Sequence, residues 1–548
     1  MNDLLATARA WRENDIDPAT QDALEALIVR AEGEDEAALA ELADAFAGPL
    51  EFGTAGLRGA LGPGPARMNR VVVSQAAAGF AAWLQASGKG GGKVIVGFDA
   101  RYNSDVFARD TAEIMTAAGF EVLLTAQPTP TPVVAFGIQH FGCVAGVVVT
   151  ASHNPPNDNG YKVYLGDGSQ IVPPTDAEIA AQIAVVAARP VAEIPRAEGW
   201  TVIDEELVAA YVARAVSLVP TDAPREISWV YTAMHGVGTR IVKRVVADAA
   251  FPDGLPVVEQ IDPDPAFPTV AFPNPEEPGA IDLALALAER EGADIVIAND
   301  PDADRCAVAA PIGGVWRMLS GDELGSLLGD DAIRRGVEGT YACSVVSSTL
   351  LGTMARAHGR PFTTTLTGFK WIGRVPDLAF GYEEAIGYCC DSHAVPDKDG
   401  ITALLTVLRI AAGLKAEGRT IADRLDEIAR EYGVHATSQL SVRVADLSII
   451  ADAMARLRGN PPETLVGEPV VVHDLLEGGD LPPTDGVELT GDRVHVVARP
   501  SGTEPKLKCY LEARVSAEET RADLPTARIK AAELLNWVRS QMKDALGV

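Results

Sequence analysis

The stretch Val144-Ala145-Gly146-Val147-Val148-Val149-Thr150 runs directly into Ala151-Ser152-His153-Asn154-Pro155. A short apolar run that ends in turn residues predicts a buried strand followed by a polar loop. Parallel α/β sheets carry their functional loops at the ends of strands, so a serine placed here could be a nucleophile. The alternative is a plain turn, which Ser and Asn beside Pro commonly make. The loop is not the Gly-x-Ser-x-Gly elbow, which argues against an acyl hydrolase.

The sequence around this loop alternates short β-branched runs with alanine-rich helical stretches, as in parallel sheets with crossover helices. The first of these α/β patterns has predicted strands at 93–99, 121–125 and 144–150 and a helix from about 104. The second has strands at 227–232 and 294–298, helices at 239–249 and 280–291, and a proline-rich stretch at 262–278. The third, 322–414, has strands near 340, 362 and 380. The remainder, with strands near 440, 470, 494 and 507 and helices near 447 and after 517, is predicted to be α+β.

Length and composition limit the possible classes of protein. At about 150 residues per domain, 548 residues predict three to four domains. The net charge of −30 argues against nucleic acid or an anionic membrane surface as a partner, because both require Lys and Arg. The acidic residues 1–17 do not form a signal peptide, and six scattered cysteines without a Cys-x-x-Cys pair indicate free thiols. A cytoplasmic protein without a membrane span is therefore expected.

A second candidate segment is Asn299-Asp300-Pro301-Asp302-Ala303-Asp304-Arg305, again after an apolar strand. Alternate carboxylates in extended backbone project to one side, where three can converge on a hard divalent cation. A calcium EF-hand is excluded, since its sixth and twelfth positions would here be Arg305 and Pro311 rather than Gly and Glu. An aspartyl nucleophile of haloacid-dehalogenase type and a solvated acidic loop both stay open.

Two further segments combine glycine, hydroxyl and charged residues. Paired glutamates in Gly381-Tyr382-Glu383-Glu384-Ala385-Ile386-Gly387 could grip vicinal sugar hydroxyls, because a carboxylate accepts several hydrogen bonds. The segment 499–508, Arg-Pro-Ser-Gly-Thr-Glu-Pro-Lys-Leu-Lys, has the composition of a phosphate cradle. The structural alternatives are surface charge and an ordinary turn. Lysine is scarce in the chain, yet five lysines fall in or beside the candidate segments: Lys162, Lys370, Lys398, Lys506 and Lys508.

Taken together, these segments resemble the α-D-phosphohexomutase family, whose members isomerise 1-phospho- and 6-phospho-sugars. The resemblance covers nearly the whole chain and includes 52–59 (Phe-Gly-Thr-Ala-Gly-Leu-Arg-Gly) and 97–101 (Gly-Phe-Asp-Ala-Arg), with all segments in family order. It implies four domains around a central cleft, three similar α/β mixed-sheet domains and a C-terminal α+β domain. We expect these domains at 1–210, 211–318, 319–433 and 434–548.

The resemblance also implies roles for individual residues. Ser152 would be the phosphoserine, and one of its phosphate oxygens would join Asp300, Asp302 and Asp304 in holding one Mg²⁺. Lys162 resembles a general acid/base assisted by His153, and Arg58 and Arg305 would be cations at the reaction centre. The expected substrate contacts are Arg101, Thr367, Gly368, Lys370, Glu383, Glu384, Lys398, Arg499, Ser501, Gly502 and Thr503.

The expected activity is a phosphosugar mutase that works through a sugar bisphosphate, which also serves as activator. The motifs Glu-Glu-Ala-Ile-Gly and Thr-Gly-Phe-Lys-Trp-Ile-Gly resemble the phosphoglucomutase/phosphopentomutase branch, in which Ala385 replaces a more usual Ser. Glucose, mannose and pentose phosphates remain possible substrates. Two alternatives are a haloacid-dehalogenase-like phosphatase with Asp300 as nucleophile and a non-catalytic phosphosugar-binding protein. Monomer and homodimer are both compatible with the composition.

Overall fold

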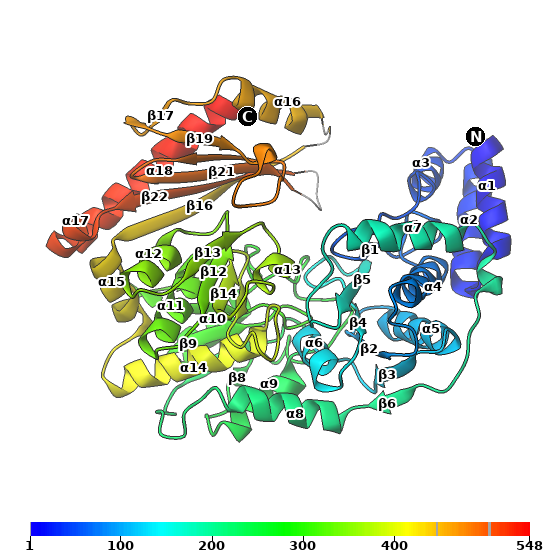
Figure 1. Ribbon diagram of the computed structural model, residues 1–548, viewed down its shortest axis with the longest axis horizontal. Coiled ribbons are helices and arrows are strands. Elements are labelled where there is room, and N and C mark those ends of the chain that lie inside the picture. The colour runs from blue at the N-terminus through cyan, green and yellow to red at the C-terminus, as the bar shows by residue number, and fades with distance from the viewer. Residues whose placement is uncertain (1, 445, 447, 502–505) are drawn as a thin grey trace. The chain divides into compact units, whose positions relative to one another are not determined.

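The computed structural model describes residues 2–444, 446, 448–501 and 506–548 (Figure 1). Its chain divides into two compact units, each formed from two segments. The first unit contains 1–309 and 393–409, and the second contains 310–392 and 410–548. The segment 393–409 therefore groups with the first unit, although the sequence places it inside the predicted third domain.

The first unit begins with three helices that the sequence analysis does not anticipate: α1 (Asn2–Asn14), α2 (Pro18–Glu32) and α3 (Glu36–Ala45). Asp17 and Asp35 cap α2 and α3 by accepting hydrogen bonds from backbone N–H groups of the first turn. The helices share a small apolar core of their own, which includes Leu24, Ile28 and Leu42. A packed core explains why this short acidic segment is folded.

The first mixed sheet of this unit has the order β1-β5-β4-β2-β3-β6. Its strands are β1 (Leu57–Ala60), β2 (Lys93–Phe98), β3 (Glu121–Thr125), β4 (Ala145–Val149), β5 (Asp158–Leu165) and β6 (Thr201–Ile203). Strands β2, β3, β4 and β6 are parallel, whereas β5 runs antiparallel to β4 and β1 antiparallel to β5. The surrounding helices are α4 (Arg70–Ala86), α5 (Ser104–Ala117), α6 (Thr131–His140), α7 (Thr175–Ala187), η1 (Val191–Glu193) and α8 (Glu205–Val216).

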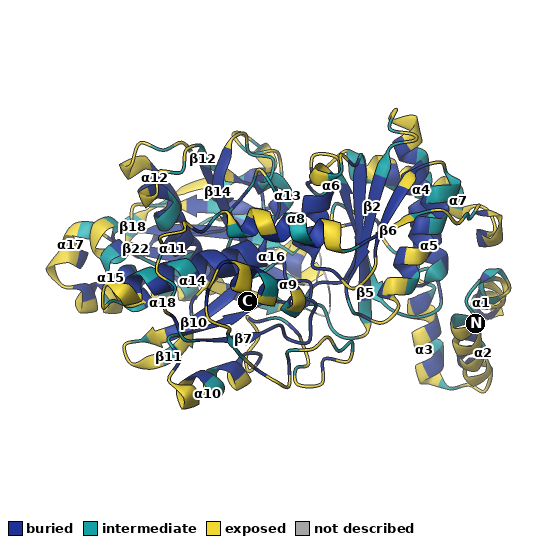
Figure 2. Ribbon diagram, turned by 90° about the horizontal axis from the view of Figure 1, so that it is seen from below, coloured by how far each residue is buried: buried dark blue, intermediate teal, exposed yellow. Residues whose placement is uncertain are grey.

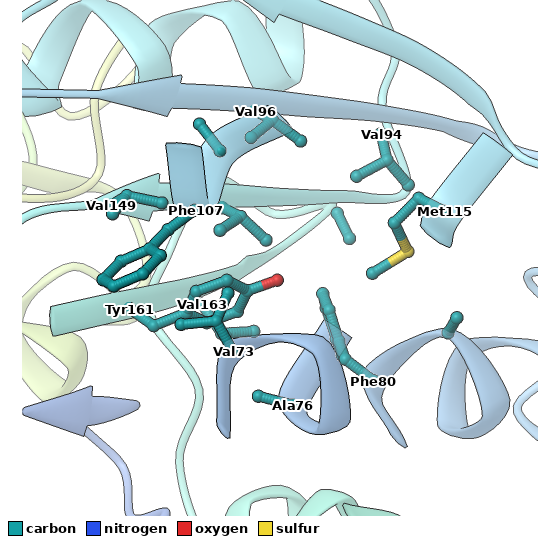
Figure 3. Close-up of a cluster of buried hydrophobic side chains, with 14 of the residues drawn as sticks. Val73, Ala76, Phe80, Val94, Val96, Phe107, Met115, Val149, Tyr161 and Val163 are labelled. Carbon is teal, nitrogen blue, oxygen red and sulfur yellow. The ribbon is translucent and has the colours of Figure 1, made fainter. Parts of the chain in front are cut away.

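The core of this sheet explains the strand pattern of the sequence. Apolar side chains from α4, α5, β2, β4 and β5 meet on one face of the sheet, as Figure 3 shows for Val73, Phe80, Val96, Phe107 and Tyr161. Every residue of β4 is buried, as expected for a central strand covered on both faces, and strand β2 is largely dark blue in Figure 2. This packing fixes the end of β4, where the serine loop starts.

The second sheet of the first unit contains the strand that precedes the aspartate segment. Its order through the unit is β10-β9-β7-β8, with β7 (Trp229–Thr232), β8 (Leu255–Pro256), β9 (Ile295–Ala298) and β10 (Ala307–Ile312). Strand β9 is parallel to β7 and antiparallel to β10. Helices α9 (Thr239–Asp248) and α10 (Asp282–Glu291) belong to the same region, and α14 (Gly400–Ala416) begins in this unit. The chain passes from the first unit to the second within β10.

The second unit contains a four-stranded and a five-stranded sheet. The first has the order β13-β12-β14-β15. Its strands and the helices of this region are α11 (Gly321–Arg334), β12 (Thr340–Ser344), α12 (Leu350–Ala357), β13 (Phe362–Thr365), α13 (Phe369–Ile372), β14 (Leu378–Glu383), β15 (Gly387–Cys389) and α15 (Ile421–Tyr432). Strand β11 (Val315–Met318) follows β10 as the edge strand of the sheet that contains β7 to β10. Strands β13, β12 and β14 are parallel. This arrangement is the predicted third α/β pattern.

The C-terminal sheet is antiparallel, with the order β16-β22-β21-β20-β19. Its strands are β16 (Val434–Arg443), β19 (Val471–Asp474), β20 (Val487–Thr490), β21 (Val494–Pro500) and β22 (Lys506–Val515). The other elements of this region are α16 (Ser448–Gly459), η2 (Leu475–Glu477), α17 (Ala517–Ala522), α18 (Leu524–Leu546) and a separate antiparallel pair of strands, β17 (Thr464–Leu465) and β18 (Glu468–Pro469). Helices α16 and α18 share one apolar core with the sheet. The predicted fold class, three α/β domains followed by one α+β domain, is confirmed.

Among the described residues, no helix is long and apolar enough to cross a membrane.

Candidate functional site

The serine loop leaves the end of β4 in a strained conformation. Ser152 has a φ of +51°, in the left-handed region that non-glycine residues seldom occupy. Its backbone N–H donates to Thr150 Oγ1 at 2.8 Å, which helps to hold the turn. The side chain is buried, with only 2% of the residue exposed. A strained and buried serine at the end of a strand is more consistent with a functional position than with a plain surface turn.

Arg101 hydrogen-bonds the backbone of this loop. Its guanidinium donates to four backbone carbonyls of the loop, those of Ser152 and Asn154 at 2.6 Å, Pro155 at 2.7 Å and Asp158 at 3.2 Å. The residue is 4% exposed, and its Nε lies 3.4 Å from Asp99 Oδ2. The resemblance predicts Arg101 as a substrate contact, and that role stays a prediction; the contacts that the structure gives to its guanidinium are those with the loop backbone.

The aspartate loop connects β9 to β10 and faces the serine. Ser152 Oγ donates to Asp300 Oδ2 at 2.8 Å, and Arg305 N donates to Asp300 Oδ1 at 3.0 Å. Thr131, the first residue of α6, donates from its hydroxyl to Asp302 Oδ2 at 2.6 Å and from its backbone N–H to the Asp302 carbonyl. The loop is therefore attached both to the serine and to the start of α6.

The three aspartates fit a divalent cation. Asp300, Asp302 and Asp304 are all buried, and each offers a carboxylate oxygen within 4.8 Å of the others. Asp302 Oδ1 and Asp304 Oδ1 are buried without a hydrogen-bond partner, which is costly for a carboxylate unless a ligand satisfies it. Three oxygen donors of this kind match the preference of hard cations such as Mg²⁺. The cluster could therefore hold a metal ion.

The charges around the triad shift its ionisation unequally. Burial, with repulsion from Asp302 and Asp304, raises the pKa of Asp300 well above its ordinary value. Lys162 Nζ donates to Asp302 Oδ2 at 2.7 Å and to Asp304 Oδ2 at 2.8 Å. Burial alone would raise the pKa of Asp304, but the Lys162 and Lys398 cations lower it below its usual range. These ion pairs keep Asp302 and Asp304 ionised.

Three further candidate residues belong to the surroundings of the serine loop. His153 Nδ1 is 3.3 Å from Ser152 Oγ and accepts a hydrogen bond from Arg305 Nη1. Burial and the neighbouring Arg305 and Arg58 cations hold the pKa of His153 well below its ordinary value, so the imidazole is neutral. Arg58, on the edge strand β1, donates to Asn154 Oδ1 at 3.2 Å.

The Lys398 segment joins this group although it is distant in sequence. Lys398 Nζ lies 3.5 Å from Asp304 Oδ2. Its neighbours are anchored by tyrosines of the same unit: Tyr164 donates to Asp397 Oδ2 at 2.9 Å, and Tyr211 donates to both oxygens of Asp399. The sequence places Lys398 with the paired glutamates, whereas the structure packs it beside the aspartate loop.

The paired glutamates and the cradle belong to the second unit. Glu383 ends β14 and Glu384 follows it, while Thr367, Gly368 and Lys370 surround the start of the short helix α13. Gly368 has a φ of +102°, which explains a glycine at this position.

The cradle begins at the end of β21. Arg499 pairs with Lys508 across β21 and β22, and Ser501 N donates to the Lys506 carbonyl at 2.8 Å. Gly502 and Thr503 lie outside the described residues.

The structure therefore assembles the candidates in two groups. The first unit brings together Arg58, Arg101, Ser152, His153, Lys162, Asp300, Asp302, Asp304, Arg305 and Lys398. The second holds Thr367, Gly368, Lys370, Glu383, Glu384, Arg499 and Ser501. Three hydroxyl residues of this region were not predicted from the sequence. Thr131 donates to Asp302 of the first group, whereas Tyr164 and Tyr211 donate to Asp397 and Asp399, the neighbours of Lys398. When the hydrogen-bond partner of a residue is distant in the chain, no local sequence pattern indicates the pair.

Known proteins resemble this chain over most of its length. Models of the four phosphoglucomutase/phosphomannomutase domains match the chain: α/β/α domain I at residues 49–189, domain II at 209–313, domain III at 320–432 and the C-terminal domain at 440–523. A protein of Haemophilus influenzae named "Probable phosphomannomutase" is 47% identical over 468 residues, covering 82% of this chain and 93% of its own. Human phosphopentomutase is 36% identical over 564 residues, covering 92% of this chain and 90% of its own.

A solved structure has the same fold. The chain of a phosphoglucomutase/phosphomannomutase family protein from Burkholderia thailandensis superimposes with a TM-score of 0.69 at 20% identity, covering 89% of this chain and 96% of that one. Fold and relatives together define an intramolecular phosphotransferase, an isomerase that acts on phosphosugars. The chain belongs to the phosphoglucomutase/phosphomannomutase family, and this assignment removes the haloacid-dehalogenase-like phosphatase alternative.

Proposed function

We propose that this enzyme interconverts hexose 1-phosphates and hexose 6-phosphates, with glucose or mannose as the sugar, through a phosphoserine at Ser152. The observation that carries the proposal is the buried Ser152 hydroxyl, 2.8 Å from Asp300 in a group of three carboxylates and at least three cations. Phosphoryl transfer requires in-line positioning and compensation of the oxygen charges rather than elaborate covalent chemistry. The cations gathered around Ser152 would supply that charge compensation.

In the first half-reaction, the P–O bond to Ser152 Oγ breaks as a new P–O bond forms to the free hydroxyl of the sugar monophosphate. The hydroxyl proton goes to a base, a role that suits the neutral His153 imidazole. The departing Ser152 oxygen takes up the proton held by that base, so the products are a sugar bisphosphate and a serine hydroxyl. In the second half-reaction, the bond between the other phosphate and its sugar oxygen breaks as a P–O bond forms to Ser152 Oγ. The serine proton passes to the base, and the departing sugar oxygen receives a proton in return.

Lys162 is suited to that protonation. Burial would lower its pKa, but the Asp302 and Asp304 carboxylates raise it above the ordinary value, so the ammonium is protonated at neutral pH. Arg58 and Arg305 would stabilise the phosphoryl oxygens during transfer. Asp300, Asp302 and Asp304, with one phosphoserine oxygen, would hold one Mg²⁺, which would spread the charge of the transferring group.

The second group of residues would recognise the rest of the substrate. Glu383 would accept hydrogen bonds from sugar hydroxyls, and Arg499, Ser501, Gly502 and Thr503 would hold the phosphate that is not transferred. Thr367, Gly368 and Lys370 of the same group would complete these contacts, and Lys398 of the first group would add another. We further propose domain boundaries at 210/211, 318/319 and 433/434, supported by the separate matches of the four family models, and a cytoplasmic location, supported by six free cysteines.

A pentose substrate is the second candidate, favoured by the 36% identity to human phosphopentomutase. The experiment that separates the two compares mutase rates on glucose, mannose, ribose and deoxyribose 1-phosphates, with Mg²⁺ and the matching bisphosphate as activator. A higher kcat/KM for a hexose phosphate supports the proposal. A higher value for a pentose phosphate assigns the second function, and no turnover on all four contradicts both.

A further inference from the structure

The loop between β12 and α12, residues 344–349, has the sequence Ser-Val-Val-Ser-Ser-Thr and is named the hydroxyl loop below. The functional residues proposed above do not include it. Residues 344–348 are all buried, and three of them are serines. A buried hydroxyl must find a partner or lose free energy. The partners of these hydroxyls indicate what the loop does.

One side of the hydroxyl loop holds Glu384. Ser344 Oγ donates to Glu384 Oε2 at 3.0 Å, and Ser347 Oγ donates to the same oxygen at 3.3 Å. Tyr510 of β22 also hydrogen-bonds the Glu384 carboxylate. The Glu384 backbone packs so closely on Gly321 that a Cβ there would lie 1.8 Å from the Glu384 carbonyl oxygen. Hydroxyl groups of the protein therefore donate hydrogen bonds to the Glu384 carboxylate, which the sequence predicts to bind sugar hydroxyls.

The other side of the hydroxyl loop holds Glu512, in the middle of β22. Ser348 Oγ donates to Glu512 Oε1 at 2.6 Å. Thr349 donates twice, from its backbone N–H to Oε1 at 3.0 Å and from its hydroxyl to Oε2 at 2.7 Å. His435 Nδ1 lies 3.0 Å from Oε1. Glu512 is 2% exposed, so these hydrogen bonds take the place of nearly all the water that would otherwise hydrate its carboxylate.

A third contact links the two sides. Ser348 N donates to Asp322 Oδ1 at 2.7 Å, and Tyr382 OH donates to the same oxygen at 3.0 Å. Tyr382 precedes Glu383 on β14 and is fully buried. The strand that presents Glu383 is thus tied to the same loop as Glu512.

The strand that carries Glu512 also carries the lysines of the proposed phosphate cradle. Strand β22 begins at Lys506, and Lys508 pairs with Arg499 of β21. Apolar contacts reinforce the connection, since Val345 and Val346 of the hydroxyl loop pack on Val497 of β21. The loop therefore contacts both elements that would bind the substrate in this unit.

We propose that the hydroxyl loop is a positioning element, which fixes the sugar-binding residue Glu383 relative to the phosphate-binding Arg499, and that Glu384 is a positioning residue rather than a sugar contact. The proposal rests on the proposed function, because it assumes that Glu383 and Arg499 bind the same phosphosugar. Satisfied buried polar networks hold a single geometry, because each broken hydrogen bond leaves a buried group unpaired. Removing one hydroxyl of the loop should therefore weaken substrate binding, although that hydroxyl does not itself contact the substrate.

The test measures the affinity of glucose 1,6-bisphosphate for the full-length, Mg²⁺-loaded enzyme by calorimetry, together with KM and kcat for glucose 1-phosphate. The variants are Ser348→Ala and the double variant Ser344→Ala/Ser347→Ala. Tyr341→Phe is the matched control, because it deletes a hydroxyl that donates at 2.9 Å to the Val337 carbonyl in the same sheet. The control reports the effect of a general loss of stability.

We expect Ser348→Ala to raise Kd and KM about fivefold, the ratio that corresponds to one lost hydrogen bond, and the double variant, which loses two, to raise them at least as much, with kcat within about twofold in both. Tyr341→Phe should lower the melting temperature and leave Kd unchanged. Unchanged Kd in both serine variants, or an equal rise in Tyr341→Phe, would overturn the positioning role. Binding without turnover in the wild-type enzyme contradicts the proposed function alone, and absence of binding in the wild type overturns both.

Discussion

The hydroxyl of Ser152 donates a 2.8 Å hydrogen bond to Asp300 Oδ2, across a sequence separation of 148 residues. Two separate sheets supply these residues, one at the end of β4 and the other after β9. A phosphate on Ser152 would place its oxygens beside the aspartates that could hold a metal ion.

Removal of one triad carboxylate should weaken metal binding in a way that a stability assay detects. Mg²⁺ that binds only the folded state raises its stability by about 2.7 kcal/mol at a hundred times Kd, so the melting temperature should rise on titration. Asp304→Asn should abolish most of that rise, because the cluster loses one anionic ligand. The control is Asp110→Asn, which removes an equally buried carboxylate that pairs with Arg70 and Arg196. An undiminished Mg²⁺ response in Asp304→Asn would contradict the assignment.

Arg101→Ala should lower kcat by at least about a hundredfold, because the serine loop loses its four carbonyl contacts and the reacting hydroxyl is no longer held in place. Arg225→Ala is a close control. Arg225 also donates to backbone carbonyls and stacks 4.9 Å from an aromatic ring, as Arg101 does. Both variants should be destabilised by about 2 kcal/mol in urea unfolding. Equal losses of kcat in the two variants would show that the effect is global.

Gly400→Ala should disturb the aspartate loop sterically. A Cβ at this position would lie 2.2 Å from the Arg305 carbonyl oxygen and 2.8 Å from that of Ala303. Because both are backbone atoms, the clash should cost about 2 kcal/mol and lower Mg²⁺ affinity. Gly413→Ala in the same helix meets no atom within 4 Å and should be neutral or slightly stabilising. A normal Mg²⁺ response in Gly400→Ala would contradict this close packing.

The pH dependence of stability should reveal Asp322. Burial raises its pKa from 3.8 to about 6 in the folded protein. The folded state therefore binds more protons than the unfolded state between these values, and this group makes stability fall as pH rises from about 4 to 6. Asp322→Asn should remove that contribution, so the variant should gain about 2 kcal/mol relative to wild type on passing from pH 4 to pH 7. A difference between the two proteins that does not change with pH would refute the shift.

The sequence predicts the local part of the site well and the long-range part poorly. Asp300, Asp302 and Asp304 are neighbours in the chain, so their convergence follows from strand geometry alone. The left-handed Ser152 and its contact with Asp300 depend on how two sheets pack, and only the family resemblance relates them in advance. Glu384 illustrates the long-range part, since the Ser344 and Ser347 hydroxyls that donate to its carboxylate lie 40 and 37 residues away in the chain.

The same distinction holds for the fold. Alternating apolar runs predict the three α/β patterns and the α+β end, because periodicity reports burial directly. Helices α1 to α3 are missed, since their charged sequence shows little of the small core around Leu24 and Leu42. The grouping of residues 393–409 with the first unit depends on hydrogen bonds such as Tyr164 to Asp397, which no periodicity encodes.

The central claim is that Ser152 carries the phosphoryl group between sugar oxygens. The most direct measurement incubates the Mg²⁺-loaded enzyme with ³²P-labelled glucose 1,6-bisphosphate, maps the labelled peptide, and then adds unlabelled glucose 1-phosphate. We expect label on Ser152, its return to sugar phosphate on the chase, and neither event in Ser152→Ala. Isomerisation without label on Ser152, or release of the label as inorganic phosphate, would contradict the account.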